Sequence, residues 1–102
     1  MIHVLDQIVL LYEEDGHVSG AFIGEEEGDG VFLSWTIMNK PGALHRALAE
    51  AIEYSRPRWS HVTFKIPDNH PRASALARVA MNRYNAKPVD CDADGVFYRF
   101  DF

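Results

Sequence analysis

The chain has 102 residues, of which 47% are hydrophobic and 25% charged, a composition typical of one compact domain rather than of a long disordered region. Fifteen acidic against ten basic residues give a net charge of −5, which argues against a nucleic-acid partner held through the phosphate backbone. The single cysteine, Cys91, excludes an internal disulfide, and no apolar run approaches the ~18 residues that span a bilayer, so we expect one domain (residues 1–102) in the reducing cytoplasm, with no membrane partner.

The first third of the chain predicts three antiparallel strands in series. Short apolar runs fall at residues 7–13, 18–23 and 31–38, and each is bounded by acidic or glycine residues. The pair Asp15-Gly16 is a strong signal for a tight hairpin turn between the first two runs. The acidic, glycine-containing stretch 24–30 is predicted to be the loop before the third strand.

The remainder predicts two helices, each followed by strands. Apolar residues recur at helical spacing over residues 43–55, and Pro57 disfavours helix just beyond them. Residues 61–66 alternate in hydrophobicity, which is typical of a strand. Asp68 or Asn69 can cap a second helix, with Pro71 in its first turn. A closing hairpin is predicted from residues 87–90, an Asp94-Gly95 turn, and the alternating residues 96–102.

This order of elements predicts an α/β fold, in which a mixed, mostly antiparallel sheet carries two main helices. It also predicts an anion site where the strand ending near Ile37 leads into the first helix, because the first N–H groups of a helix have no partner within the helix. A plain helix-capping turn explains the same residues. Both interpretations stay open.

Several local segments resemble the GNAT superfamily of N-acyltransferases, and the resemblance extends over most of the chain. The family's pyrophosphate loop has the form Arg/Gln-x-x-Gly-x-Gly/Ala, and the best match here places Lys40, Ala43 and His45 at its three defining positions. The helix 44–53 fits the family helix. Residues 66–69 are similar to the end of the family's next strand, and residues 82–89 to its last junction, with Asn85 where Gly is usual.

The resemblance implies an acetyl-CoA-dependent enzyme that transfers an acyl group from acyl-CoA to an amine acceptor. The residues it assigns to cofactor binding are Ile37, Met38, Lys40, Gly42, Ala43, Leu44, His45 and Asn69. Both loop glycines are replaced, which favours an alternative, a catalytically inactive GNAT-fold module that binds a protein partner. Short divergent versions of the fold include such proteins, some of them viral. A homodimer stays open.

The sequence does not identify one catalytic residue. Tyr84 can protonate a leaving thiolate, although a tyrosine on an apolar helical stripe is usually a core residue. Glu27, in the acidic run 25–27, can deprotonate an amine, although such a run is more often a solvated hairpin loop. Asn69 can bind the cofactor or cap a helix. We expect Trp35 and Trp59 to be packing residues.

One further motif is similar to a calcium-binding loop but is explained by a turn between strands. The segment 90–95 has the letters of the start of a calcium loop, and Asp101 falls where the closing acidic ligand belongs. The flanking helices that such a loop needs are not predicted, and an Asp-Gly turn between two strands produces the same letters. We therefore assign no metal site. His61 lacks a sequence context for a hydrolase triad.

Overall fold

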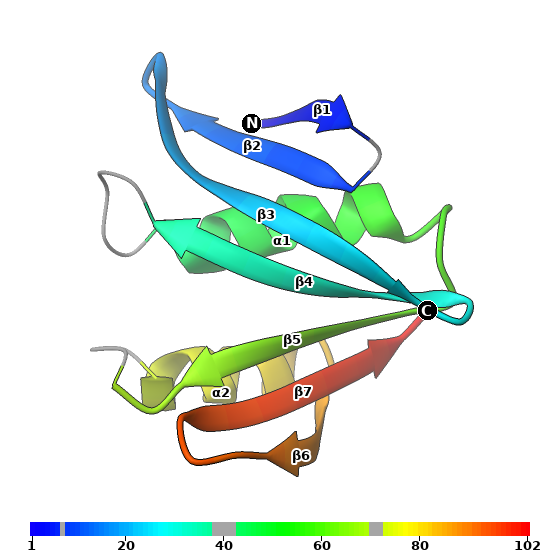
Figure 1. The fold of residues 1–102 in the computed structure, drawn as a ribbon. Helices are drawn as coiled ribbons and strands as arrows, with labels where there is room; N and C mark the ends of the chain where they lie inside the picture. Colours follow the sequence, from blue (N-terminus) through cyan, green and yellow to red (C-terminus); the bar gives the residue numbers. More distant parts are fainter. Residues whose placement is uncertain (7, 38–42, 70–72) are drawn as a thin grey trace.

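The structure is a computed structural model that describes residues 1–6, 8–37, 43–69 and 73–102. In these residues seven strands form one sheet of order β1-β2-β3-β4-β5-β7-β6 (Figure 1). The strands are β1 (Ile2–Asp6), β2 (Val9–Glu14), β3 (His17–Glu27), β4 (Gly30–Ile37), β5 (His61–Pro67), β6 (Lys87–Cys91) and β7 (Gly95–Asp101).

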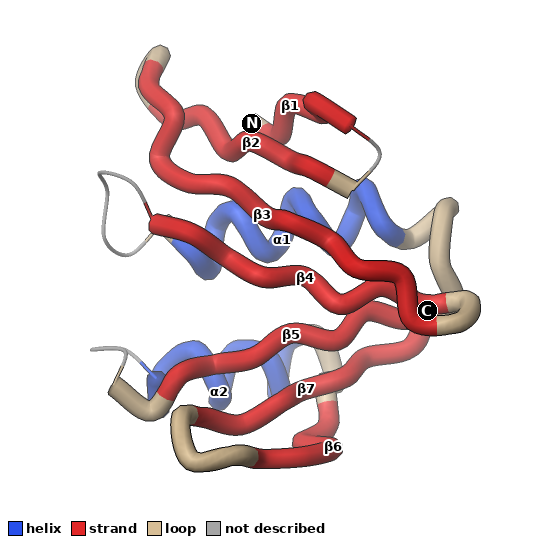
Figure 2. The backbone as a smooth tube through the Cα atoms, in the orientation of Figure 1, coloured by secondary structure: helices blue, strands red, loops and turns tan. Residues whose placement is uncertain are grey.

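The sheet is mixed, as expected. Within the described strands β4 and β5 pair in parallel, and every other neighbouring pair is antiparallel. The parallel pair is connected through α1 (Leu44–Ser55), and α2 (Ala73–Arg83) follows β5. Figures 1 and 2 show both helices behind the same face of the sheet. The core lies between that face and the helices.

The helices bury the stripes that the sequence indicates. On α1, Ala47 and Ala51 are fully buried, and their small side chains allow a close approach to the sheet. Leu76 and Ala80 are the buried residues of α2. Asn85 has φ +57° directly after α2, a left-handed conformation that explains why the related position is usually glycine.

The predicted turns at Asp-Gly pairs are confirmed. Asp15 and Gly16 both have positive φ and connect β2 to β3 by a two-residue turn, the conformation for which Asp-Gly is preferred. The segment 90–95 forms the end of β6 and the turn into β7. There the Asp92 carboxylate accepts hydrogen bonds from the backbone N–H groups of Asp94 and Gly95.

Two expectations need correction. The run Glu25–Glu27 is not a loop, because β3 continues through it and pairs with the first residues of β4; the turn is the shorter Gly28-Asp29. The sequence reading also missed β1, which is an edge strand paired with β2.

No described helix has the length and apolar character needed to cross a bilayer.

Candidate functional site: a gap between two parallel strands

The central feature of the site is the point at which β4 and β5 stop pairing. Their parallel ladder extends from Val31 with Val62 to Leu33 with Phe64, yet β4 continues to Ile37 and β5 to Pro67. Each strand stays paired on its other side, β4 with β3 and β5 with β7. Figure 1 shows the two strands separating toward the ends from which the helices follow. Their facing edges therefore carry backbone groups without ladder partners.

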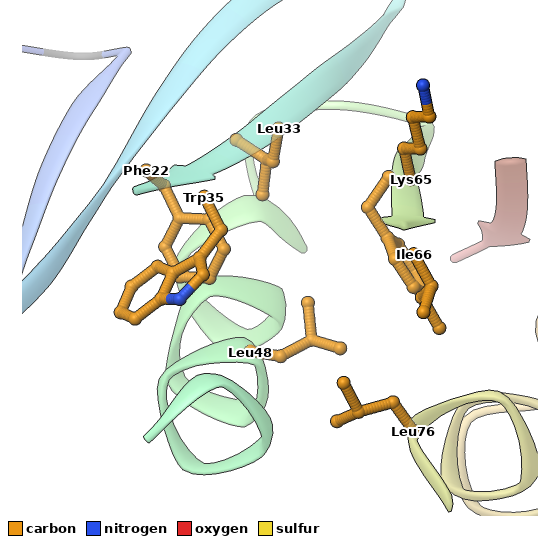
Figure 3. Close-up of a pocket in the computed structure, with 8 residues that line it drawn as sticks. Phe22, Leu33, Trp35, Leu48, Lys65, Ile66 and Leu76 are labelled. Carbon is orange, nitrogen blue, oxygen red and sulfur yellow. The ribbon is translucent and has the colours of Figure 1, made fainter. Parts of the chain in front are cut away.

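An apolar pocket lies under this separation, on the helix side of the sheet (Figure 3). Leu48 from α1 and Leu76 from α2 reach toward one another and form its floor. The internal volume is about 20 Å³, which is room for one group the size of a water molecule. The side chains that line it are Phe22, Leu33, Trp35, Leu48, Phe64, Lys65, Ile66 and Leu76.

Among the described lining residues, Trp35 is the one whose side chain has a buried polar atom without a hydrogen-bond partner. Its indole packs on Phe22 with the ring centroids 4.7 Å apart and the planes tilted by 48°. The indole nitrogen is buried and has no hydrogen-bond partner among the described residues. In Figure 3 this nitrogen lies on the side of the ring that faces α1. Phe22 is only 1% exposed and packs against the indole, so packing restricts the orientation of the ring.

The cation at the pocket's rim is already paired. Lys65 Nζ lies 2.8 Å from Asp92 Oδ2, and Figure 3 shows the ammonium pointing away from the two leucines of the floor. The hydrogen bond with Asp92 raises the pKa of Lys65. The same bond, with the backbone N–H groups of Asp94 and Gly95, lowers the pKa of Asp92. The described pocket therefore presents no free positive charge.

The first turn of α1 lies next to the end of β4, where the two strands separate. Ala43 is the N-cap residue, so no side chain caps the helix, and no acidic residue occupies its first turn. Arg46 is engaged elsewhere, because its guanidinium donates hydrogen bonds of 2.6 and 2.9 Å to the carboxylate of Glu14 on β2. That contact raises the pKa of Arg46. The positive end of the helix dipole at the start of α1 therefore has no side-chain cap.

Three of the predicted cofactor residues with a described backbone lie at the start of α1, and a fourth ends β4. Ile37 is the last residue of β4, Ala43 is the buried N-cap of α1, and the backbone of Leu44 and His45 begins the helix. The side chains of Ile37, Leu44 and His45, and the whole of Met38, Lys40 and Gly42, lie outside the described part of the chain. Asn69 is exposed in the turn after β5, and the N-cap of α2 falls outside the described residues.

The two catalytic candidates lie away from the pocket. Tyr84 follows the end of α2, eight positions after Leu76, which corresponds to roughly 12 Å along a helix. The centroid of its ring lies 6.3 Å from that of Phe100. Glu27 ends β3, five positions after Phe22, or roughly 17 Å along a strand. It accepts a hydrogen bond from the Thr63 hydroxyl. Their catalytic roles stay predictions.

Sequence reasoning did not find the pocket itself. The sequence predicts that Trp35 is a packing residue and that Leu76 belongs to the buried stripe of the second helix, and it predicts no pocket formed by these two residues and Lys65. Alternation along β4 puts Trp35 on the same face as Leu33, which was the available signal. The pocket exists because the pairing of β4 with β5 ends at Leu33 and Phe64. That end point depends on how two distant segments pack, so no local sequence pattern predicts it.

This arrangement of strands and helices is similar to that of solved N-acetyltransferase structures. A ribosomal-protein-alanine N-acetyltransferase from Brucella melitensis is similar with a TM-score of 0.64 at 21% identity, over 92% of this chain and 68% of that one. The chain has the GNAT fold. PaiA N-acetyltransferase from Thermoplasma acidophilum, solved in complex with coenzyme A, is similar with a TM-score of 0.60 at 10% identity, over 93% of this chain and 60% of that one.

The likeness to these GNAT-fold enzymes is one of structure. No protein-family model matches the sequence, and no curated protein does. The chain spans 60 to 68% of the length of the two solved structures. At these identities the comparison establishes the expected fold, a mixed sheet with two helices in the described residues.

Proposed function

We propose that this chain binds an acyl-CoA between β4 and β5 and transfers the acyl group to an amine. The observation that carries the proposal is the parallel ladder that ends at Leu33 and Phe64 while both strands continue. The pantetheine arm of CoA is a narrow chain with two amides. Such a chain can bond to the unpaired edge of a strand much as another strand would. The complex of PaiA with coenzyme A supports this ligand class for the fold.

The start of α1 provides a place for the pyrophosphate. Free N–H groups and the positive end of the helix dipole attract an anion, and no described side chain competes for them. Because Arg46 is bound to Glu14, we assign phosphate binding to the backbone and to Lys40 rather than to Arg46. The acidic balance of the chain suits a cationic amine as the second substrate.

The reaction requires little from side chains beyond positioning. The ammonium first gives one proton to solvent. The neutral amine nitrogen then attacks the thioester carbonyl carbon, the C–N bond forms, the C–S bond breaks, and the second proton lost by the nitrogen balances the thiolate that leaves as CoA thiol. The protein would orient the thioester between the strands and polarise its carbonyl with a backbone N–H. Tyr84 and Glu27 do not line the described pocket, so we assign neither as acid or base.

A charge substitution in the first turn of α1 tests the CoA site. His45→Glu adds an anion where helix dipoles favour one, so we expect the fold to keep its stability or gain about 0.3–1 kcal/mol. The same charge opposes a pyrophosphate. At a separation of roughly 5 Å the repulsion is about 1–3 kcal/mol, which weakens CoA binding by about fivefold or more. His45→Gln is the matched neutral control.

Isothermal titration with CoA, together with thermal unfolding, reads out both effects. The proposal predicts that the Glu variant loses affinity and the Gln variant keeps most of it, with both melting temperatures preserved. Equal CoA affinity in the two variants would place the pyrophosphate away from α1.

A second candidate is a module that binds a protein partner without acyl transfer. The observation that favours it is the chemistry of the described pocket, in which Lys65 is the one titratable lining residue and is paired with Asp92. An assay of CoA release with a panel of primary amines separates the two candidates. Saturable acetyl-CoA binding with no CoA released by any amine would favour the binding module.

A further inference from the structure

The indole nitrogen of Trp35 is a buried donor with no acceptor among the described residues. Buried donors are nearly always paired, because an unpaired one destabilises the folded protein. Trp35 lines the pocket under the separation of β4 and β5. A donor held in this way marks where an acceptor of a bound molecule would lie.

From this placement we infer that Trp35 is a ligand-binding residue whose indole N–H donates a hydrogen bond to an uncharged carbonyl oxygen of the acyl-pantetheine arm. The inference rests on the proposed function and adds a side-chain contact to it. An acyl-CoA carries two kinds of such oxygen, the thioester carbonyl and the two pantetheine amides. Both share the chemistry of a neutral acceptor on a narrow chain.

The surroundings of Trp35 favour a neutral acceptor over an anion. The pocket's other side chains are aliphatic or aromatic except for Lys65. The Lys65 ammonium is held by Asp92 at 2.8 Å and points away from the floor of the pocket. A carboxylate placed beside Trp35 would lose its hydration without gaining a counter-charge, which is strongly unfavourable.

A trapped water is a poorer partner than a carbonyl. The volume of about 20 Å³ admits one water molecule, but a buried water needs two to four polar partners. Among the lining side chains, Trp35 supplies one donor, and Leu48, Leu76 and Phe64 supply none. A carbonyl oxygen needs a single donor, so the Trp35 indole alone satisfies it.

The indole is also preorganised. Phe22, which is 1% exposed, holds one side of the ring at a centroid distance of 4.7 Å. A donor whose rotamer is fixed before binding loses little entropy when the ligand arrives. The ring therefore needs no change of rotamer to donate, and its nitrogen becomes accessible to a ligand oxygen when the neighbouring side chains shift.

Nitrogen-15 NMR of the two tryptophan indoles tests the contact directly, because the chain has only Trp35 and Trp59. Trp59 is half-buried, packs on Tyr54 at 6.2 Å and does not line the pocket, so its signal is an internal control. Addition of acetyl-CoA is expected to shift the Trp35 indole N–H and leave that of Trp59 unchanged. A shift with CoA as well identifies an amide carbonyl as the acceptor, whereas a shift with acetyl-CoA alone identifies the thioester.

Substitution of Trp35 by Phe separates a binding role from a structural one. The variant keeps an aromatic ring and removes the unpaired donor, so we expect a melting temperature equal to or above that of a Trp59→Phe control. Affinity for the ligand that shifts the Trp35 signal is expected to fall by roughly threefold to tenfold, the value of one neutral hydrogen bond. A structural indole would show the opposite pattern, with lower stability and unchanged affinity.

The outcomes distinguish this inference from the proposed function. CoA binding to the wild type with an unmoved Trp35 indole and an unaffected Trp35→Phe variant overturns the inference and leaves acyl-CoA binding intact. Absence of any binding by CoA and acetyl-CoA overturns both. A Trp35 shift together with the selective loss of affinity supports both.

Discussion

Substitution of Leu76 by Ala tests whether the pocket under the strand separation receives the acyl end of the ligand. Leu76 is 8% exposed on α2 and forms part of the floor of a pocket of about 20 Å³. That volume holds a group no larger than about a water molecule, so the wild type is expected to bind acetyl-CoA more tightly than butyryl-CoA. Removal of three carbons from the floor makes room for a longer chain.

The size of the effect follows from the hydrophobic contribution of the added carbons. Each buried methylene contributes about 0.8 kcal/mol, or about fourfold in affinity, and butyryl exceeds acetyl by two methylenes. The Leu76→Ala variant is therefore expected to raise the affinity ratio of butyryl-CoA to acetyl-CoA by roughly tenfold to fifteenfold. Isothermal titration of both ligands against both proteins gives the ratio directly.

The same change has a stability effect that must be measured beside it. A buried Leu→Ala substitution costs about 2–5 kcal/mol, a large part of the stability of a small domain, so the titrations belong well below the variant's melting temperature. Met81→Ala is the matched control, since Met81 lies on the same helix, is 39% exposed and does not line the pocket. A folded Leu76→Ala variant with the wild-type ratio, or a Met81→Ala variant with the same shift, would show that this pocket does not receive the acyl end of the ligand.

Two further predictions concern stability. A Cβ added at Gly30 would lie 2.1 Å from Nε2 of the buried His61, so Gly30→Ala is expected to lower the free energy of unfolding by about 1–3 kcal/mol in urea denaturation, and His61→Ala to rescue part of that loss. A Gly30→Ala variant as stable as the wild type would contradict this contact. The pKa of Asp92 is lowered from 3.8 by its bond to Lys65, so its contribution to stability is present above that value and is lost as the pH falls through the lower folded pKa. Between about pH 4 and pH 2 the melting temperature of the wild type should therefore fall more steeply than that of Asp92→Asn, and parallel curves would show that the pair contributes nothing.

Local signals predicted the helices and most of the sheet. The spacing of Ala47, Leu48, Ala51 and Ile52 is an unambiguous helical stripe, and α1 begins within one residue of the predicted start. Asp15-Gly16 specifies its turn through the positive φ that both residues adopt. These features depend on a few neighbouring residues, which is why the sequence alone is sufficient.

Features that depend on distant partners were missed. β1 is an edge strand that exists because it pairs with β2, and no turn signal separates the two. Glu25 and Glu26 look like loop residues, yet they extend β3 because Phe32 and Val31 pair with them across the hairpin. The unpaired indole of Trp35 is likewise visible only in three dimensions, although alternation places the residue on the core face.

Hydrogen exchange of the backbone amides, with and without saturating acetyl-CoA, tests most directly whether the ligand binds between β4 and β5. The gap between these strands opens after Leu33 and Phe64, so we expect slower exchange in peptides that cover residues 34–37, 65–67 and the start of α1, and unchanged exchange in β1 and β6. Protection confined to other segments, or the same exchange throughout the chain at millimolar ligand, would contradict the claim that the separated strands form the acyl-CoA site.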